Sequence, residues 1–245
     1  MTKRLFALLL ALAPGLSLAA GEVHLESSGV NIQDEASLQR GAALYANYCS
    51  GCHSLAMSRY SRVAADLNLT EEQVQANLNF AGTQFGGLMT IAMPRGDAQA
   101  WFGKTPPDLS LAARRLHGGP DYIYSFLKGY YVDETRPTGW NNTVMVGTSM
   151  PHVLWDLQGV QAAVFGASPG PGQPAPVERL EPKAEGRLSP EQYDRVARDI
   201  SAYLTYVAEP AGLDRERYGL WVVLFLAGFT FLAWLLKTEY WNDVH

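Results

Sequence analysis

Five consecutive residues, Cys49-Ser50-Gly51-Cys52-His53, contain both cysteines of the chain, with a histidine directly after the second. Two thiols on one helical turn can form thioethers to the two vinyl groups of a single porphyrin, and the next imidazole can bind its iron. Cys-x-x-Cys-His is therefore the attachment signal of a c-type haem. The motif predicts Cys49, Cys52 and His53 as haem-binding residues, with His53 as an axial ligand of the iron.

Three other uses of a cysteine pair agree less well with the sequence. A structural zinc site needs four ligands, but there is no second cysteine pair and no H-x3–5-H pair among His24, His117, His152 and His245. A thioredoxin-like redox pair belongs in a βαβ unit, whereas the residues around this motif have helical spacing. A disulfide between Cys49 and Cys52 would leave His53 without a role.

A haem held by one histidine has a second axial position, and methionine is the expected ligand there. Met57 is only four residues from His53, on the wrong side of the ring. Met93-Pro94 and Met150-Pro151 are the main candidates, because a proline after the ligand stiffens its loop. Met150 also lies in a turn-rich stretch ahead of the last helix of the body, which favours it over Met93. The remaining candidates are Met89, Met145 and the other histidines, and any of these methionines could simply pack in the core.

Composition places this sequence among ordinary folded proteins. The 245 residues correspond to one or two domains. A mildly acidic net charge of −5 and 47% hydrophobic residues disfavour nucleic-acid binding and disorder. We find no acid, base or nucleophile constellation, so the sequence does not indicate an enzyme acting on its own.

The amino-terminal end reads as a secretory signal peptide over residues 1–20. Lys3 and Arg4 form its positive start, Leu5–Leu12 its apolar core, and Ser17–Ala20 supplies small residues for cleavage near Gly21. Export agrees with the haem motif, because c-type haem is attached on the exported side. The expected exported haem domain covers residues 21–213.

The carboxy-terminal region, residues 214–245, reads as a transmembrane anchor. Tyr218–Leu236 contains 19 residues without a charge, which at about 1.5 Å per residue spans roughly 28 Å, the thickness of a hydrocarbon core. Charges beside the span orient it only weakly. The signal peptide and the haem instead place the body outside and the tail Lys237–His245 inside. Aromatic residues suited to the two interfaces are Trp221, Trp234, Tyr240 and Trp241.

Capping and periodicity predict a mainly helical body with long loops and few strands. Asp34 and Asp108 are expected helix caps, and capping boxes begin at Thr70 and Ser189. Residues 166–187, rich in proline and glycine, suggest an irregular surface excursion. The expected helices cover residues 35–48, 71–80, 109–116, 120–131 and 190–208.

Gly41 lies in the middle of the first expected helix, which also delivers the haem motif. Glycine costs about 1 kcal/mol there relative to alanine. A close crossing with another helix would explain the residue, and a neutral surface position is the alternative.

At this point the chain resembles the cytochrome c1 family, the haem subunits of cytochrome bc1 complexes, especially the bacterial form. The resemblance covers nearly the whole mature chain. Its marks are the Met150-Pro151 loop, a single carboxy-terminal anchor, and the segments RGAALYANYCSGCHS, KTPPDLSLAARRLHGGPDYIYSFLKGYY and SAYLTYVAEP. The PPDLS segment with HGG, and the AEP before the anchor, are much more specific than Cys-x-x-Cys-His alone.

The resemblance implies a class I cytochrome c-type domain with long loop insertions, one covalent haem c, and His53 and Met150 as iron ligands. Pro107 is then expected to pack near the haem and Tyr122 near a propionate. The family often carries a propionate-binding arginine two residues beyond Arg114. That position is Leu116 here, and Arg115 is the substitute. Crossing of the first and last helices would place Gly41 against Tyr203 or Leu204.

The resemblance also implies a function and its partners. The protein would take one electron from the Rieske iron–sulfur protein and pass it to a soluble cytochrome c, while quinol is oxidised on cytochrome b. It would be a single-pass protein of the bacterial inner membrane, in a dimeric complex, with the haem domain on the periplasmic side. The alternatives are a membrane-tethered cytochrome subunit of another dehydrogenase or oxidase, and a haem gas sensor with an open iron.

Overall fold

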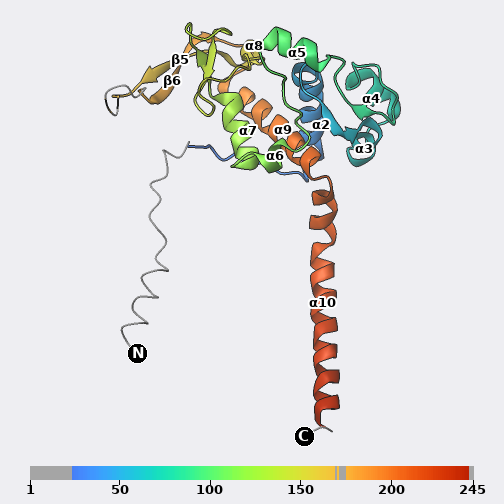
Figure 1. The fold of residues 1–245 in the computed structure, drawn as a ribbon. Helices are drawn as coiled ribbons and strands as arrows, with labels where there is room; N and C mark the ends of the chain where they lie inside the picture. Colours follow the sequence, from blue (N-terminus) through green and yellow to red (C-terminus); the bar gives the residue numbers. More distant parts are fainter. Residues whose placement is uncertain (1–23, 169, 171–174, 243–245) are drawn as a thin grey trace, which may run out of the picture.

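The computed structural model describes residues 24–168, 170 and 175–242, so the expected signal peptide lies outside the described residues. Within them a mainly helical body stands at one end of a long helix, α10 (Figure 1). The helices are α2 (Glu35–Leu44), a π-helical turn η1 (Tyr45–Cys49), α3 (Tyr60–Asp66), α4 (Glu71–Asn77), α5 (Arg95–Phe102), α6 (Ala112–Arg115), α7 (Gly119–Lys128), α8 (Trp155–Gln158), α9 (Pro190–Ala208) and α10 (Ala211–Asn242).

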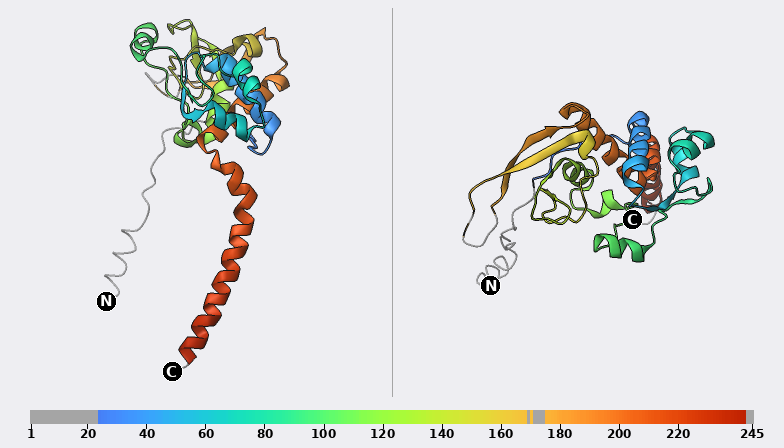
Figure 2. Two further views of the ribbon diagram at one scale, coloured as in Figure 1. Left: turned by 90° about the vertical axis from the view of Figure 1, so that its right-hand side faces the viewer. Right: turned by 90° about the horizontal axis from the view of Figure 1, so that it is seen from above.

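In the described part of the chain, three antiparallel pairs of strands supplement these helices. They are β1 (Leu55–Arg59) with β2 (Leu88–Met89), β3 (Tyr130–Val132) with β4 (Trp140–Asn142), and β5 (Gly159–Phe165) with β6 (Val177–Glu185). Seen from above, the β5–β6 hairpin projects on one side of the body, and α3 and α4 lie on the other (Figure 2). The crossing of α2 and α9 lies between them.

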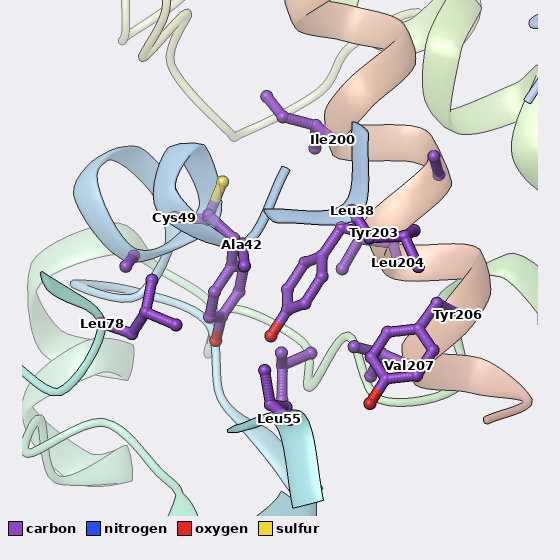
Figure 3. Close-up of a cluster of buried hydrophobic side chains, with 14 of the residues drawn as sticks. Leu38, Ala42, Cys49, Leu55, Leu78, Ile200, Tyr203, Leu204, Tyr206 and Val207 are labelled. Atoms are coloured by element: carbon purple, nitrogen blue, oxygen red, sulfur yellow. The ribbon is translucent and has the colours of Figure 1, made fainter. Parts of the chain in front are cut away.

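The α2–α9 crossing forms the centre of the core. Aliphatic side chains of α2 face the tyrosines and aliphatic residues of α9, and Cys49 follows at the end of the same helical segment (Figure 3). Gly41 permits the close approach, because a methyl group there would lie 2.7 Å from the Cβ atom of Tyr203. The predicted close crossing is therefore confirmed, with Tyr203 as the facing residue. Fully buried members of this core include Leu38, Ala42, Ile200 and Tyr203.

The predicted caps at Asp34, Thr70 and Ser189 are confirmed. The Asp34 carboxylate accepts the Ser37 amide, and both capping boxes are complete. Asp108, in contrast, does not cap a helix. Its carboxylate accepts the amides of Ala56 and Ser110, so it stabilises the turn before α6, which begins only at Ala112.

Two other expected segments differ from the structure. The helix predicted to reach Tyr131 ends at Lys128, because the Asn142 side chain donates to the Phe126 carbonyl and the chain turns at Gly129 into β3. Within the excursion predicted for residues 166–187, Val177–Glu185 is instead the return strand of the β5–β6 hairpin. Its charged strand β6 is mostly exposed, so it lacks the apolar alternation by which strands are recognised.

The anchor prediction agrees with α10. Arg217–Asn242 is long and apolar enough to cross a membrane, and the side chains of its apolar window are not buried within the protein. Trp221 and Leu224 are examples, with 69% and 54% of their surface exposed. Such a surface would be unfavourable in water, since it offers a continuous apolar cylinder with no protein partner.

Candidate haem site

The helix that carries the motif widens from α2 into the π-helical turn η1, which ends at Cys49. The amides of Cys52 and His53 both donate to the Cys49 carbonyl, at 3.0 and 2.9 Å, and so fold the motif into a compact turn. The Tyr45 hydroxyl donates to the His53 carbonyl. Cys49 and Cys52 are free thiols, the first buried and the second half-buried. The two sulfurs and the imidazole therefore come from one fixed turn.

The imidazole of His53 is oriented by a backbone carbonyl. Its Nδ1 atom lies 2.7 Å from the oxygen of Pro107. A carbonyl oxygen can only accept, so Nδ1 carries the proton and Nε2 keeps its lone pair. Burial is the main cause that lowers the pKa of His53, which favours the neutral ring. This tautomer is the one that an axial iron ligand requires.

The segment that supplies Pro107 is itself tied to the strand after the motif. The Leu109 amide donates to the Ser54 carbonyl at 2.9 Å, and the Met57 amide to the Ser110 hydroxyl at 3.0 Å. Together with the Asp108–Ala56 contact, these bonds hold the Pro107 carbonyl in register with His53. The sequence suggested Pro107 only through the family resemblance. The carboxylate and hydroxyl that position it were not identified, although PPDLS contains both.

The two candidate methionines lie in different surroundings, and both are half-buried. Met93 lines a cavity of about 190 Å³ together with Ser50 and Gly51 of the motif. Met150 belongs to the loop after β4. Its carbonyl accepts the Tyr130 hydroxyl at 3.2 Å, and its amide donates to the Thr148 hydroxyl at 3.3 Å.

The two expected propionate-binding residues lie on adjacent helices that pack together, α6 and α7. Tyr122 is half-buried and stacks on Phe126 with 6.3 Å between ring centroids. Arg115 is exposed at the end of α6, and its guanidinium group forms no ion pair within the described part of the chain. Leu116 packs partly buried against the hydrophobic core, which accounts for an apolar residue at the position where the family often has arginine.

Comparison with known proteins agrees with this geometry. A profile described as the Cytochrome C1 family matches residues 27–84, 92–161 and 186–244. The chain belongs to the cytochrome c1 family. Membership implies a c-type haem, and the free cysteine pair with an oriented neutral histidine is chemically suited to one.

Individual relatives extend over most or all of the chain. A cytochrome c1 from Allochromatium vinosum is 48% identical, covering 100% of both chains. A protein named ammonia monooxygenase gamma subunit from Nitrosomonas europaea is 38% identical, covering 97% of both. A cytochrome c1 from Rhodospirillum rubrum is 31% identical over 86% of this chain and 83% of its own.

Proposed function

We propose that this chain is the haem-bearing electron-transfer subunit of a bacterial cytochrome bc1 complex. The observation that carries the proposal is the hydrogen bond from His53 Nδ1 to the Pro107 carbonyl. It fixes the ring plane and leaves Nε2 as the atom that binds iron. Cys49 and Cys52 form the two thioethers. The haem, when bound, supplies a one-electron carrier, and the chain orients it, buries it and excludes substrates from its iron.

Met150 supplies the second axial ligand in this proposal. A histidine and a methionine together raise the reduction potential of a haem and fill both axial positions, which suits electron transfer rather than gas binding. Pro107 packs against the haem, and Tyr122 and Arg115 contact its propionates. No residue of this chain then needs to act as an acid, base or nucleophile, so the chain is not an enzyme on its own.

The proposed partners follow from the family. One electron arrives from the Rieske iron–sulfur protein and leaves to a soluble c-type cytochrome, while cytochrome b oxidises the quinol within a dimeric complex. Residues 1–20 direct export, residues 21–213 form the haem domain, and residues 214–245 anchor it. With α10 in the inner membrane, the body lies on the periplasmic side.

A second candidate is a membrane-tethered cytochrome subunit of another dehydrogenase or oxidase. The relative named ammonia monooxygenase gamma subunit motivates it, because it covers 97% of this chain. Such a subunit would keep the haem and the anchor but would need no dock for a Rieske protein. The two candidates therefore differ in partners and not in the haem site.

Purification of the full chain in a mild detergent tests the proposal. We expect cytochrome b and a Rieske protein to co-purify with it, and quinol to reduce its haem in that preparation. An inhibitor of quinol oxidation should prevent the reduction. Recovery of the chain with subunits of another dehydrogenase or oxidase, and with neither cytochrome b nor a Rieske protein, would contradict the proposal and favour the second candidate.

A further inference from the structure

Three aromatic side chains pack together beside Met150, and one of them, His152, belongs to the same loop. Tyr130 and His152 stack face to face, with 4.7 Å between ring centroids and 8° between planes. Trp140 meets His152 edge-on at 5.1 Å and 79°. We call Tyr130, His152 and Trp140 the aromatic clamp. Because His152 is two residues beyond Met150, the clamp fixes the chain just after the methionine.

Strand pairing brings the two outer members of the clamp together. Tyr130 pairs with Asn142, and Val132 pairs with Trp140. Side chains two positions apart on a strand share a face, so Tyr130 and Trp140 lie diagonally on one face of the β3–β4 pair. His152 packs against both rings and is only 3% exposed. Its Nε2 atom is buried without a hydrogen-bond partner among the described residues, and the ring contacts Tyr130 face to face and Trp140 edge-on.

The hydroxyl of Tyr130 adds a direct bond to the methionine itself, through the Met150 carbonyl. Tyr130 is 1% exposed, and its ring also meets Phe126 edge-on at 5.2 Å. Phe126 in turn stacks on Tyr122. One continuous row of rings thus joins the residue expected near a propionate to the Met150 loop.

The start of the same loop is fixed by two buried asparagines. The Asn142 side-chain oxygen accepts the amides of Val144 and Met145, at 2.8 and 3.2 Å. The Asn141 side-chain oxygen accepts the Gly147 amide at 2.8 Å. Asparagine side chains therefore fix the part of the loop that precedes Met150, and the aromatic rings fix the part that follows it. The Met150 backbone is left with little freedom.

We propose that the aromatic clamp positions the Met150 thioether on the haem iron. The inference rests on the proposed role of Met150 as axial ligand. Tyr130, His152 and Trp140 are positioning residues that act through the loop backbone. Loosening the clamp lets the thioether leave the iron in a larger fraction of molecules. The potential then falls, because methionine is the ligand that favours ferrous iron, and the vacated position accepts an external ligand.

The test uses the full haem-bearing protein in mild detergent and three readouts. These are the near-infrared sulfur-to-iron band, the rate of carbon monoxide binding to the ferrous haem, and a redox titration. We expect His152→Ala to weaken the band, to bind carbon monoxide several-fold faster and to titrate at a lower potential. His152→Phe keeps an aromatic ring for stacking and should restore all three.

Tyr130→Phe removes only the hydroxyl bonded to Met150, and it serves as the second variant if His152→Ala does not accumulate. It should shift the readouts in the same direction by a smaller amount. Tyr131→Phe is the matched control, because Tyr131 is also buried but meets Phe165 instead. It should change none of the three readouts.

Unchanged readouts in both His152→Ala and Tyr130→Phe would overturn the proposal that the aromatic clamp positions Met150. Met150→Leu separates that failure from a failure of the proposed ligand. If Met150→Leu abolishes the band while the clamp variants leave it intact, only the clamp is wrong. If Met150→Leu keeps the band, the ligand assignment is wrong, and the clamp proposal is overturned with it.

Discussion

A methyl group on Gly41 would lie 2.7 Å from the Cβ atom of Tyr203, and closer still to the backbone oxygen of Asp199. The same crossing is joined by polar contacts. The Asp199 carboxylate accepts the Ser37 hydroxyl at 2.6 Å and two bonds from the Arg40 guanidinium. The first and last helices of the body are therefore held at a separation that only glycine permits.

Replacing Gly41 with alanine should destabilise the body. Forcing atoms into a packed contact costs about 1–3 kcal/mol or more, which exceeds the roughly 1 kcal/mol that alanine contributes to a helix. We expect the unfolding temperature of the haem protein to fall by several degrees. Gly96→Ala is the control, since Gly96 is helical with open space around it, and it should be neutral or slightly stabilising. An equal response of the two variants would contradict a close crossing at Gly41.

The features that sequence reasoning predicted correctly depend on neighbours along the chain. Capping boxes at Thr70 and Ser189 need residues three positions apart, and α9 shows one apolar face over 19 residues. Gly41 was recognisable because a mid-helix glycine has a known cost that something must offset. These signals are local in the sequence, so they can be recognised without knowledge of the tertiary structure.

The features that were missed depend on partners distant in sequence. Aspartate is a common helix-capping residue, but the Asp108 carboxylate instead accepts the amide of Ala56, which is 52 residues away. The extended segment before α2 also gave no signal, although its Ser28 is 1% exposed and binds Asp121. In the site, neither the Pro107 carbonyl nor the Tyr130 hydroxyl could be assigned a partner. A sequence motif identifies the residues that bind the haem. The groups that orient those residues come from distant parts of the chain.

Acid should weaken the body through Asp194. Partial burial alone would raise the pKa of this carboxyl, but hydrogen bonds from Tyr124 and Lys128 outweigh burial and hold the pKa below its ordinary value. A carboxyl with a lowered folded-state pKa contributes stability that is present above the unfolded-state pKa of about 4 and is lost as pH falls through the folded-state pKa.

Asp194→Asn should therefore lower the unfolding temperature at neutral pH and reduce its decline in acid. Thermal unfolding followed at a series of pH values between neutral and strongly acidic measures both effects. Asp97→Asn, at an exposed position in the first turn of α5, is the control. A decline in acid that is as steep in Asp194→Asn as in the unmodified protein would refute this assignment.

Covalent attachment should require both cysteines. Cys49→Ala or Cys52→Ala should each prevent normal double attachment, with an unstable body because its core then lacks a fixed haem. The mass of the denatured chain and its pyridine haemochrome spectrum report the number of thioethers. Ser50→Ala lies between the cysteines, loses only a bond to the Ala46 carbonyl, and should keep both. A fully attached, low-spin haem in a variant lacking both cysteines would exclude this mode of attachment.

Removing the anchor should release the haem domain. Deletion of Tyr218–His245 takes away most of α10, whose apolar window packs against nothing within the body. We expect an exported, soluble protein that carries haem. Fractionation of cells expressing the truncated chain alone measures the outcome. If the truncated chain remains in the membrane without partners, a second anchor must exist.

Electron transfer through a haem ligated by His53 and Met150 is the central claim, and Met150→Leu tests it most directly. Leucine preserves size and apolarity, so the packing cost should stay below about 1.5 kcal/mol, while the thioether is lost. The near-infrared sulfur-to-iron band should vanish, the potential should fall, and electron flow from quinol to cytochrome c in the assembled complex should slow sharply. Met93→Leu should change none of these. Loss of the band in Met93→Leu and its survival in Met150→Leu would contradict the account and assign the distal position to the loop that lines the cavity beside Gly51.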